Sequence, residues 1–143
     1  PPRQATLVPY TTLFRSKYHE AQMHRLNIHA EIPDPVIHNY LTDLDLAVVL
    51  GHLMDNAIDG ARKASEGFIS LAYFDEEDCQ SFIIESTIAE EQVPLSMMST
   101  QLSHPEGGIG VNAVQDILER YPNTSFSVRS HNHKMMQILE MRP

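Results

Sequence analysis

Apolar residues follow two different spacings along this chain, and each spacing predicts a kind of secondary structure. Between residues 42 and 67 they recur every three or four positions, which is the period of one face of a helix. This segment opens with Thr42-Asp43-Leu44-Asp45, which has the form of a capping box in which the threonine hydroxyl accepts from free backbone amides. We therefore expect a long helix that begins after Thr42 and ends near Gly67. Its apolar face consists of Leu46, Leu50, Leu53, Ala57, Ala61 and Ala64.

Two other segments predict helices. Residues 17–25 contain neither glycine nor proline and predict a short helix. After residue 110 a second apolar face with helical spacing stops at Pro122, because proline cannot continue the backbone hydrogen bonding. The residues of this face are Val111, Val114, Ile117, Leu118 and Tyr121.

A spacing of two between apolar positions, with β-branched and aromatic residues, predicts strands. The first such run, residues 27–32, is stopped by Pro33, and residues 33–41 are expected to form a connector. Two further runs flank the acidic segment 75–78, so we expect an antiparallel hairpin with a solvated turn. The predicted strands after Pro33 are residues 68–74, 81–85, 125–129 and 134–141.

Residues 87–107 show no sustained period and contain two prolines. Loops of this length in compact domains are usually lids or binding loops, and we expect such a lid here. The predicted order is therefore helix, strand, long helix, strand, strand, lid, helix, strand, strand. This mixture predicts an α+β fold, a two-layer sandwich in which helices cover one face of a mostly antiparallel sheet.

Composition narrows the class of protein. The 143 residues suffice for one ordinary domain, and a formal net charge of −9 disfavours a nucleic-acid groove or an anionic membrane surface as partner. Cys79 is the only cysteine, so the chain can build no internal disulfide, which fits a reducing compartment. The apolar stretches are too short to span a bilayer, and the first residues lack a signal-peptide pattern. We therefore expect a cytoplasmic domain.

The first 16 residues differ in character from the rest. Residues 9–16, with the sequence Pro-Tyr-Thr-Thr-Leu-Phe-Arg-Ser, look like a translated DNA-sequencing adapter, and a foreign segment of this kind takes no part in a fold. The alternative is a natural leader rich in proline and threonine. We expect residues 1–16 to be a non-native or disordered leader that packs poorly, and the domain to occupy residues 17–143.

The long predicted helix carries a row of polar residues beside its apolar face. His52, Asn56 and Asp59 are four and three positions apart, so at about 100° per residue they fall within an arc of ~60°. The oxygen of a carboxamide is a hard and neutral ligand, which suits Mg²⁺ when phosphates supply the negative charge. Asn56 is therefore a candidate metal ligand. The alternative is a solvated helix flank that binds nothing.

A glycine-rich segment, Gly107-Gly108-Ile109-Gly110, precedes the last predicted helix. Glycines in this place allow backbone amides to approach phosphate oxygens, and the helix N-terminus adds a partial positive charge. No Gly-Lys-Ser/Thr follows as in a Walker loop, and no strand leads into the segment as in a Rossmann turn. The segment predicts a phosphate-binding loop, and a flexible hinge is the alternative.

These two motifs, separated by a lid-like segment, resemble those of the GHKL ATP-binding fold of gyrases, chaperones, histidine kinases and mismatch-repair ATPases. The resemblance spans residues from about 20 to 141 and is carried by residues 50–59 and 108–114, with the strand 137–140 in agreement. The chain looks most similar to the catalytic domain of peptide-pheromone (quorum-sensing) sensor histidine kinases. The resemblance implies a Bergerat-type sandwich that binds ATP and Mg²⁺.

The resemblance also implies roles for individual residues. Asn56 would bind the magnesium ion and orient the triphosphate. Gly108 and Gly110 would let backbone amides surround the phosphates, and Asn112 belongs to the same nucleotide-binding motif. His52 stands where such kinases usually have asparagine and where the ATP-hydrolysing branches have a general-base glutamate, so a contact with phosphate or water is expected of it.

The adenine end departs from the family pattern. Most members place an aspartate after the central strand, and pheromone-receptor kinases commonly have asparagine there, whereas this chain has Ser86. Ser86 could accept from the adenine amino group through its hydroxyl, and Glu85 could substitute if the strand register shifted. Asp59 would line the nucleotide cavity. Gln101 stands where related kinases often have a lysine that contacts phosphate.

The family implied is that of two-component sensor histidine kinases, whose catalytic domain positions Mg-ATP for phosphoryl transfer to a histidine on a separate dimerisation segment. The partners implied are this segment and a cytoplasmic response regulator, with no nucleic acid, and a parent protein that is membrane-anchored and homodimeric. Two alternatives remain. One is a degenerate, non-catalytic GHKL-fold interaction module, which His52, Ser86 and Gln101 favour. The other is an anti-sigma-type serine kinase of the same superfamily.

Overall fold

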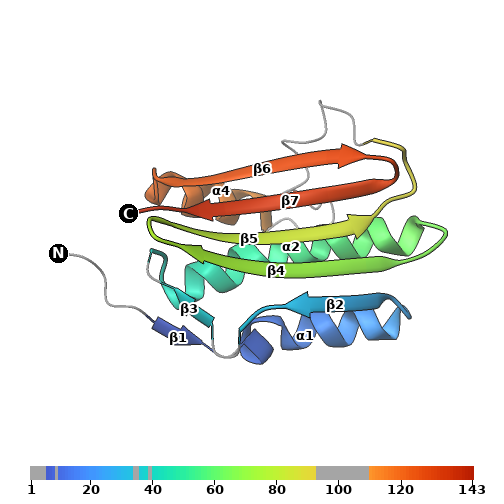
Figure 1. The fold of residues 1–143 in the computed structure, drawn as a ribbon, viewed down its shortest axis with the longest axis horizontal. Coiled ribbons are helices and arrows are strands. Elements are labelled where there is room, and N and C mark those ends of the chain that lie inside the picture. Colours follow the sequence, from blue (N-terminus) through green and yellow to red (C-terminus); the bar gives the residue numbers. More distant parts are fainter. Residues whose placement is uncertain (1–5, 9, 34–35, 39, 93–109) are drawn as a thin grey trace.

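The computed structural model describes residues 6–8, 10–33, 36–38, 40–92 and 110–143, which form the helices and strands labelled in Figure 1. The helices are α1 (Tyr10–Met23), α2 (Asp43–Lys63) and α4 (Gly110–Arg120). The strands are β1 (Thr6–Val8), β2 (Asn27–Glu31), β3 (Val36–His38), β4 (Phe68–Glu76), β5 (Cys79–Thr87), β6 (Thr124–His131) and β7 (Lys134–Met141).

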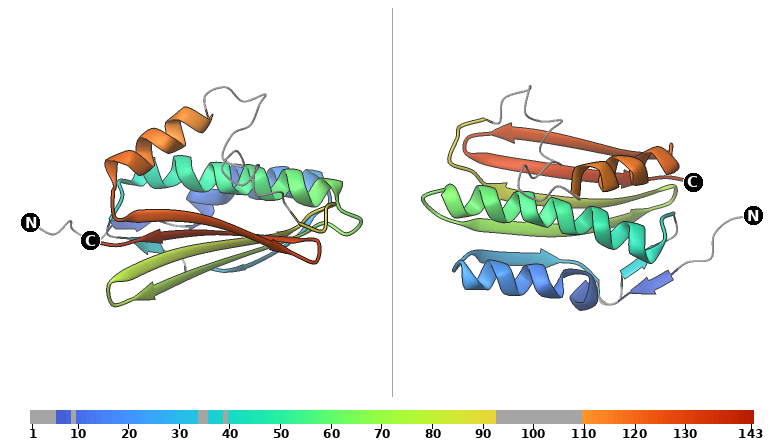
Figure 2. Two further views of the ribbon diagram at one scale, coloured as in Figure 1. Left: turned by 90° about the horizontal axis from the view of Figure 1, so that it is seen from above. Right: turned by 180° about the vertical axis from the view of Figure 1, so that it is seen from behind.

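The main sheet has five strands in the order β2-β4-β5-β7-β6. Strand β2 pairs with β4 in parallel, and the other neighbouring strands pair antiparallel. Helices α1, α2 and α4 all lie over the same face of this sheet, with α2 between the other two (Figure 2). The predicted α+β two-layer sandwich with a mostly antiparallel sheet is therefore confirmed.

Side chains of the central strands alternate between the helix-covered face and the outer face, as the pleat of a strand requires. On β5 every second residue from Gln80 to Ser86 is buried, and on β7 every second residue from Met135 to Met141. Ser86 pairs with Met135, and two residues along Ile84 pairs with Gln137. Two polar side chains, those of Ser86 and Gln137, therefore lie close together on the face that the helices cover.

Helix α2 begins where the sequence predicts. Thr42 caps it, because Thr42 Oγ1 accepts from the backbone N–H of Asp45 at 3.2 Å. The helix ends at Lys63 and not near Gly67, since Ala64 already has an extended backbone with φ −80° and ψ 158°. A Cβ at Gly67 would overlap Leu26 Cδ2, so a glycine at this position lets the chain pass Leu26 at close range before β4 begins.

The predicted apolar face of α2 forms the centre of the core. Leu46, Leu50, Leu53, Ala57 and Ala61 are each at most 1% exposed. The buried surface is wider than the predicted stripe because α1 and α4 cover the flanks of α2 (Figure 2). The additional buried apolar residues of this helix are Val49, Met54 and Ile58.

Helix α1 corrects two of the expectations. It begins at Tyr10, before the predicted start at residue 17, and Phe14 is 0% exposed within the hydrophobic core. The expectation that residues 1–16 pack poorly is therefore wrong for Phe14, because a large apolar side chain on this helix gains free energy by burial beside α2. The predicted connector 33–41 contains the short strand β3, which pairs antiparallel with β1. The origin of residues 1–16, and the domain boundary at residue 17, stay predictions.

An ionic contact joins the start of α2 to the end of α4. Asp45 is 7% exposed, and Arg120 donates to both carboxylate oxygens, from Nη2 to Oδ1 at 3.0 Å and from Nη1 to Oδ2 at 3.2 Å. The Tyr121 hydroxyl donates to Asp45 Oδ2 at 2.6 Å. Burial raises the pKa of Asp45, but the hydrogen bonds from Tyr121, Thr42 and Arg120, together with the Arg120 charge, outweigh it, so the pKa lies below its usual value. The ionised carboxylate therefore stabilises the folded protein at neutral pH.

We expect Asp45→Asn to lower the free energy of unfolding at pH 7 by about 1–3 kcal/mol, because it removes a charged, nearly buried acceptor. A carboxyl whose pKa is lower in the folded than in the unfolded protein contributes stability above its unfolded pKa, and this contribution is lost as pH falls through the folded pKa. In urea titrations at pH 7 and pH 3, the wild type should therefore lose more stability on acidification than Asp45→Asn. Asp116→Asn, at an exposed position of α4, is the control. Equal acid sensitivity of wild type and Asp45→Asn would contradict this assignment.

Helix α2 and the segment that follows β5 approach closely at Gly60. A Cβ on Gly60 would lie 2.8 Å from Ile88 Cγ2 and 3.3 Å from the Thr87 carbonyl oxygen. The absence of a side chain therefore lets this turn of α2 pack directly on the end of β5. At Gly51, on the same helix, a Cβ would lie 3.8 Å from Lys17 Cε, which is an ordinary contact.

Gly60→Ala and Gly51→Ala should change stability in opposite directions. Both substitutions gain up to about 1 kcal/mol of helix propensity. At Gly60 the added methyl group must also displace Ile88 or the Thr87 backbone, and overpacking of this kind costs about 1–3 kcal/mol. We expect Gly60→Ala to lower, and Gly51→Ala to raise, the midpoint of thermal unfolding measured by circular dichroism. A rise in both midpoints would show that a methyl group fits beside Gly60.

Candidate functional site

Asn56 lies in the middle of α2 on the side that faces the sheet. It is 7% exposed, and its Nδ2 donates to Gln137 Oε1 at 3.1 Å. Gln137 Nε2 in turn donates to the Leu53 carbonyl oxygen at 2.8 Å. Among the residues that the structure describes, none donates to Asn56 Oδ1. A solvated helix flank, the alternative interpretation of this row of residues, therefore does not describe Asn56.

The other two residues of the row, His52 and Asp59, are less buried. His52 is half-buried one turn before Asn56. The Asp59 side chain is 40% exposed, and its Oδ1 lies 4.0 Å from Arg62 Nη1 on the helix surface. The row thus follows one flank of α2 and is most deeply buried at Asn56.

Ser86 is a second polar residue between the sheet and the helices. It is 1% exposed on β5, and its Oγ lies 3.8 Å from the position that a Cβ on Gly60 would occupy. Within the described ranges, Ser86 Oγ has no hydrogen-bond partner. A buried hydroxyl without a partner is unfavourable, so a bound group that donates or accepts at this point would stabilise the site. Ser86 therefore offers a hydroxyl to a bound group on the helix-covered face of the sheet.

Glu85 does not reach this position. Neighbouring residues of a strand point to opposite faces, and the burial along β5 places Glu85 on the outer face with Ser81 and Ile83. Glu85 could take the place of Ser86 only if the pairing of β5 with β7 shifted in register. In the structure Glu85 pairs with Met136, and Ser86 stays on the helix-covered face. The structure therefore does not bring Glu85 together with the other candidates.

The glycine motif is described only from its last residue onward. Gly110 is the first residue of α4, in agreement with the expectation that the glycines precede a helix. Gly108 and Gln101 lie within residues 93–109, which are outside the described residues. The side chain of Asn112 is also not among those that the structure describes. Of the predicted phosphate-binding segment, the structure thus describes the N-terminal end of α4, a helix that packs beside α2.

The described residues fit a metal ion that is bound mainly through phosphates. Within the described ranges there is no group of three or more His, Cys, Asp or Glu side chains that could hold a metal ion. Mg²⁺ usually keeps several waters and takes only one or two protein ligands in addition to substrate phosphates. The Asn56 carboxamide, whose nitrogen is bonded towards the sheet, offers its oxygen as such a ligand.

Gln137 belongs to a strand that agrees with the family resemblance, but the resemblance implies no role for it. The structure makes it the hydrogen-bond partner of Asn56 and of the α2 backbone at Leu53. The sequence signal was a glutamine at an inward position of β7, between Met135 and Leu139, where the alternation calls for an apolar residue.

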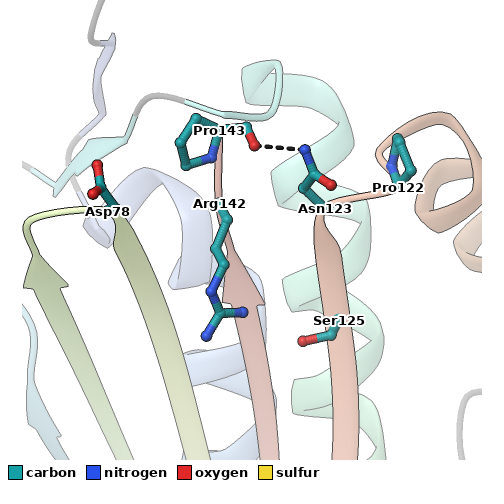
Figure 3. Close-up of a pocket in the computed structure, with 6 residues that line it drawn as sticks. All are labelled: Asp78, Pro122, Asn123, Ser125, Arg142 and Pro143. Carbon is teal, nitrogen blue, oxygen red and sulfur yellow. Dashed lines mark hydrogen bonds between the residues drawn. The ribbon is translucent and has the colours of Figure 1, made fainter.

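A surface pocket lies at the other end of the sheet (Figure 3). It is lined by Asp78, Pro122, Asn123, Ser125, Arg142 and Pro143. These residues belong to the β4–β5 turn, the start of β6 with the turn before it, and the residues after β7. Gln80 pairs with Met141 at this end of the sheet and Ser86 pairs with Met135 at the opposite end. The pocket is therefore separate from Ser86 and Asn56.

Comparison with known proteins agrees with this geometry. A family model described as the GHKL domain matches residues 41–142. No curated protein matches the chain. The fold is similar to that of the catalytic domain of histidine kinase ThkA, with 14% identity, a TM-score of 0.70 and 97% of each chain covered. It is also similar to the mycobacterial sensor histidine kinase MprB, with 11% identity, a TM-score of 0.69, and 98% of this chain and 97% of that chain covered.

A third solved structure, the Acinetobacter baumannii histidine kinase AdeS, has 14% identity and a TM-score of 0.70, with 99% of this chain and 68% of that chain covered. At these identities the likeness concerns the fold. In the described part of the chain, no helix combines the length and the apolar character needed to cross a membrane. The family match covers more than half of the residues and includes Asn56, Ser86 and Gly110. The chain therefore belongs to the GHKL domain family and has the fold of histidine kinase catalytic domains.

Proposed function

We propose that the protein is the ATP-binding catalytic domain of a two-component sensor histidine kinase. It would hold Mg-ATP so that the γ-phosphoryl group can pass to a histidine on a separate dimerisation segment. One observation carries this proposal: Asn56 and Ser86 lie on facing elements of a GHKL fold, α2 and β5. Asn56 offers a carboxamide oxygen to a metal ion. Ser86 offers a base its buried hydroxyl, which has no partner among the described residues.

Phosphoryl transfer requires positioning and charge neutralisation more than covalent chemistry by the protein. Asn56 would bind Mg²⁺ through Oδ1. The backbone amides of Gly108 and of Gly110, the first residue of α4, would surround the phosphates, and Asn112 would contribute to the same nucleotide-binding motif. His52, one turn before Asn56, would contact a phosphate or a water molecule.

The adenine end has fewer candidates. Ser86 would accept from the adenine amino group, and Asp59 would line the cavity at the C-terminal end of α2. A hydroxyl is a weaker acceptor than the carboxylate that most GHKL domains have at this position. We therefore expect modest affinity for ATP.

We also propose a parent protein of the peptide-pheromone sensor type, cytoplasmic in this part, membrane-anchored and homodimeric. Its domain would occupy residues 17–143 after an adapter-like leader of residues 1–16, from which Phe14 packs into the core of the domain. A response regulator would receive the phosphoryl group. This partner is supported by a solved complex of histidine kinase ThkA with the response regulator protein TrrA, because the kinase in that complex has a similar fold. The identity is 15% and the TM-score 0.68, with 96% of this chain and 41% of that chain covered.

A degenerate interaction module is the second candidate function. Two observations favour it: Ser86 replaces the usual carboxylate, and Asn56 is 7% exposed and bonded into the core. Such a module would keep the fold without productive binding of ATP.

Titration of the purified protein with ATP distinguishes the two candidates. We expect the wild type to bind ATP more tightly with Mg²⁺ than in EDTA, and Asn56→Ala to lower the affinity with Mg²⁺ about tenfold or more, because a metal ligand is lost. In EDTA both proteins should bind ATP alike. Isothermal titration calorimetry measures all four affinities.

Gln80→Ala is the matched control, because it removes a fully buried side-chain amide from β5 at the end of the sheet away from Ser86. It should leave ATP binding unchanged, which separates loss of stability from loss of a ligand. The absence of binding by the wild type up to millimolar ATP would defeat the kinase proposal and favour the interaction module. Binding that Asn56→Ala leaves intact would defeat the assignment of Asn56.

Ser86→Ala should separate stability from base recognition. Removal of a buried hydroxyl without a partner should leave the free energy of unfolding unchanged or slightly raised. Loss of one neutral hydrogen bond to adenine should weaken ATP binding about threefold to tenfold and leave binding of inorganic tripolyphosphate unaffected. Ser81→Ala, on the outer face of β5, is the control. Equal weakening of ATP and tripolyphosphate would exclude a role of Ser86 at the base.

A further inference from the structure

We propose that Gln137 is a positioning residue that sets the orientation of the Asn56 carboxamide, so that oxygen and not nitrogen faces the metal ion. This inference rests on the proposed function, because it concerns the binding of Mg²⁺ with the nucleotide. It adds a residue of the last strand, β7, to a site otherwise formed by α2, β5 and the start of α4.

The two ends of a side-chain amide differ only in what they can donate and accept, so their neighbours decide which way each amide faces. The Leu53 carbonyl oxygen can only accept a hydrogen bond. Gln137 must therefore present its NH₂ group to Leu53, and the observed distance from Nε2 to this oxygen is 2.8 Å. Gln137 Oε1 is then left to face α2.

The orientation of Gln137 decides that of Asn56. Since Gln137 Oε1 can only accept, Asn56 must present Nδ2 to it, and these atoms lie 3.1 Å apart. Asn56 Oδ1 is thereby directed away from the sheet. A backbone oxygen of α2 thus determines, through Gln137, which atom of Asn56 is available to a ligand.

Burial makes this orientation hard to reverse. Gln137 is 0% exposed, and β7 is paired on both sides, with β5 and with β6. If the Asn56 amide turned around, its oxygen would face Gln137 Oε1, and two acceptors would meet without a proton between them. Neither oxygen could be hydrated at such a buried position, so the reversed state is strongly disfavoured.

The orientation matters because a divalent cation binds carboxamides through oxygen. A carboxamide that turns freely presents its NH₂ group, whose hydrogens carry partial positive charge, for part of the time. Without Gln137, the binding of Mg²⁺ would first have to fix the amide, and the affinity would fall accordingly. Gln137 thus prepares the ligand before the metal ion arrives.

Gln137→Met tests the proposal, because methionine has a similar length and fills the space with no donor and only a weakly accepting sulfur. The first measurement uses the protein without nucleotide or metal. In NMR spectra of ¹⁵N-labelled wild type, the Asn56 side-chain proton that is hydrogen-bonded to Gln137 should exchange slowly with water. In Gln137→Met this exchange should become faster by about tenfold, the ratio expected for one lost hydrogen bond.

The second measurement is the ratio of ATP affinity with Mg²⁺ to ATP affinity in EDTA. Gln137→Met should lower this ratio severalfold while the affinity in EDTA stays the same. Gln80→Met is the matched control, because Gln80 is also 0% exposed in the same sheet but lies at the end away from Ser86. It should lower stability to a similar degree and leave the ratio unchanged. In an Asn56→Ala background, Gln137→Met should have no further effect on the ratio.

The outcomes are distinct. A wild type whose ATP binding does not depend on Mg²⁺ would overturn the proposed function and this inference with it. Mg²⁺-dependent binding by the wild type that Gln137→Met leaves unchanged, or lowers no more than Gln80→Met, would overturn this inference alone. Unchanged exchange of the Asn56 NH₂ protons in Gln137→Met would also overturn it.

Discussion

Helix α2 has to bury an apolar face against the sheet and, on the same side, carry the polar group of the candidate site. Leu53 and Ala57 face the core, and Asn56, next to Ala57, is drawn into the same interface. A carboxamide at such a depth is tolerated only when it is hydrogen-bonded. The sheet meets this requirement with Gln137, and the glycine at position 60 lets α2 approach Ser86 closely. The position of the site therefore follows from the packing of one helix on two strands, β5 and β7.

Ionic contacts fix the other helices relative to α2. Lys17 of α1 lies 2.6 Å from Asp55, with both side chains partly exposed, so this pair contributes little to stability but favours one register of α1 along α2. In the pair of Asp45 with Arg120, the Asp45 side chain is nearly buried. It also accepts a hydrogen bond from the Tyr121 hydroxyl. Charges at the two flanks of α2 thus orient its neighbours, while apolar contacts supply most of the free energy.

Long segments with a clear period could be predicted from the sequence: α2, the β4–β5 hairpin, α4 and the last two strands all lie close to their expected positions. The misses depend on distant contacts. Nothing near Phe14 in the sequence shows that α2 will cover it, and the three residues of β3 form a strand only because β1 pairs with them. Asn56 was found from its place in a row of polar residues on the predicted helix, and a family motif then implied its role. The role of Gln137 could not be found in this way, because it depends on the placing of β7 beneath α2.

The contact between Asp45 and Arg120 holds α4 at its last turn, whereas the residue expected near phosphate, Gly110, is at its first. With a rise of 1.5 Å per residue, these two ends of the helix are roughly 15 Å apart. A rotation of about 10° around the Asp45 contact would therefore move the Gly110 amide by about 3 Å, which is the length of a hydrogen bond. The alignment of this amide with Asn56 thus depends on how firmly the Asp45 contact and the core packing of Val114 and Ile117 together hold the angle of α4.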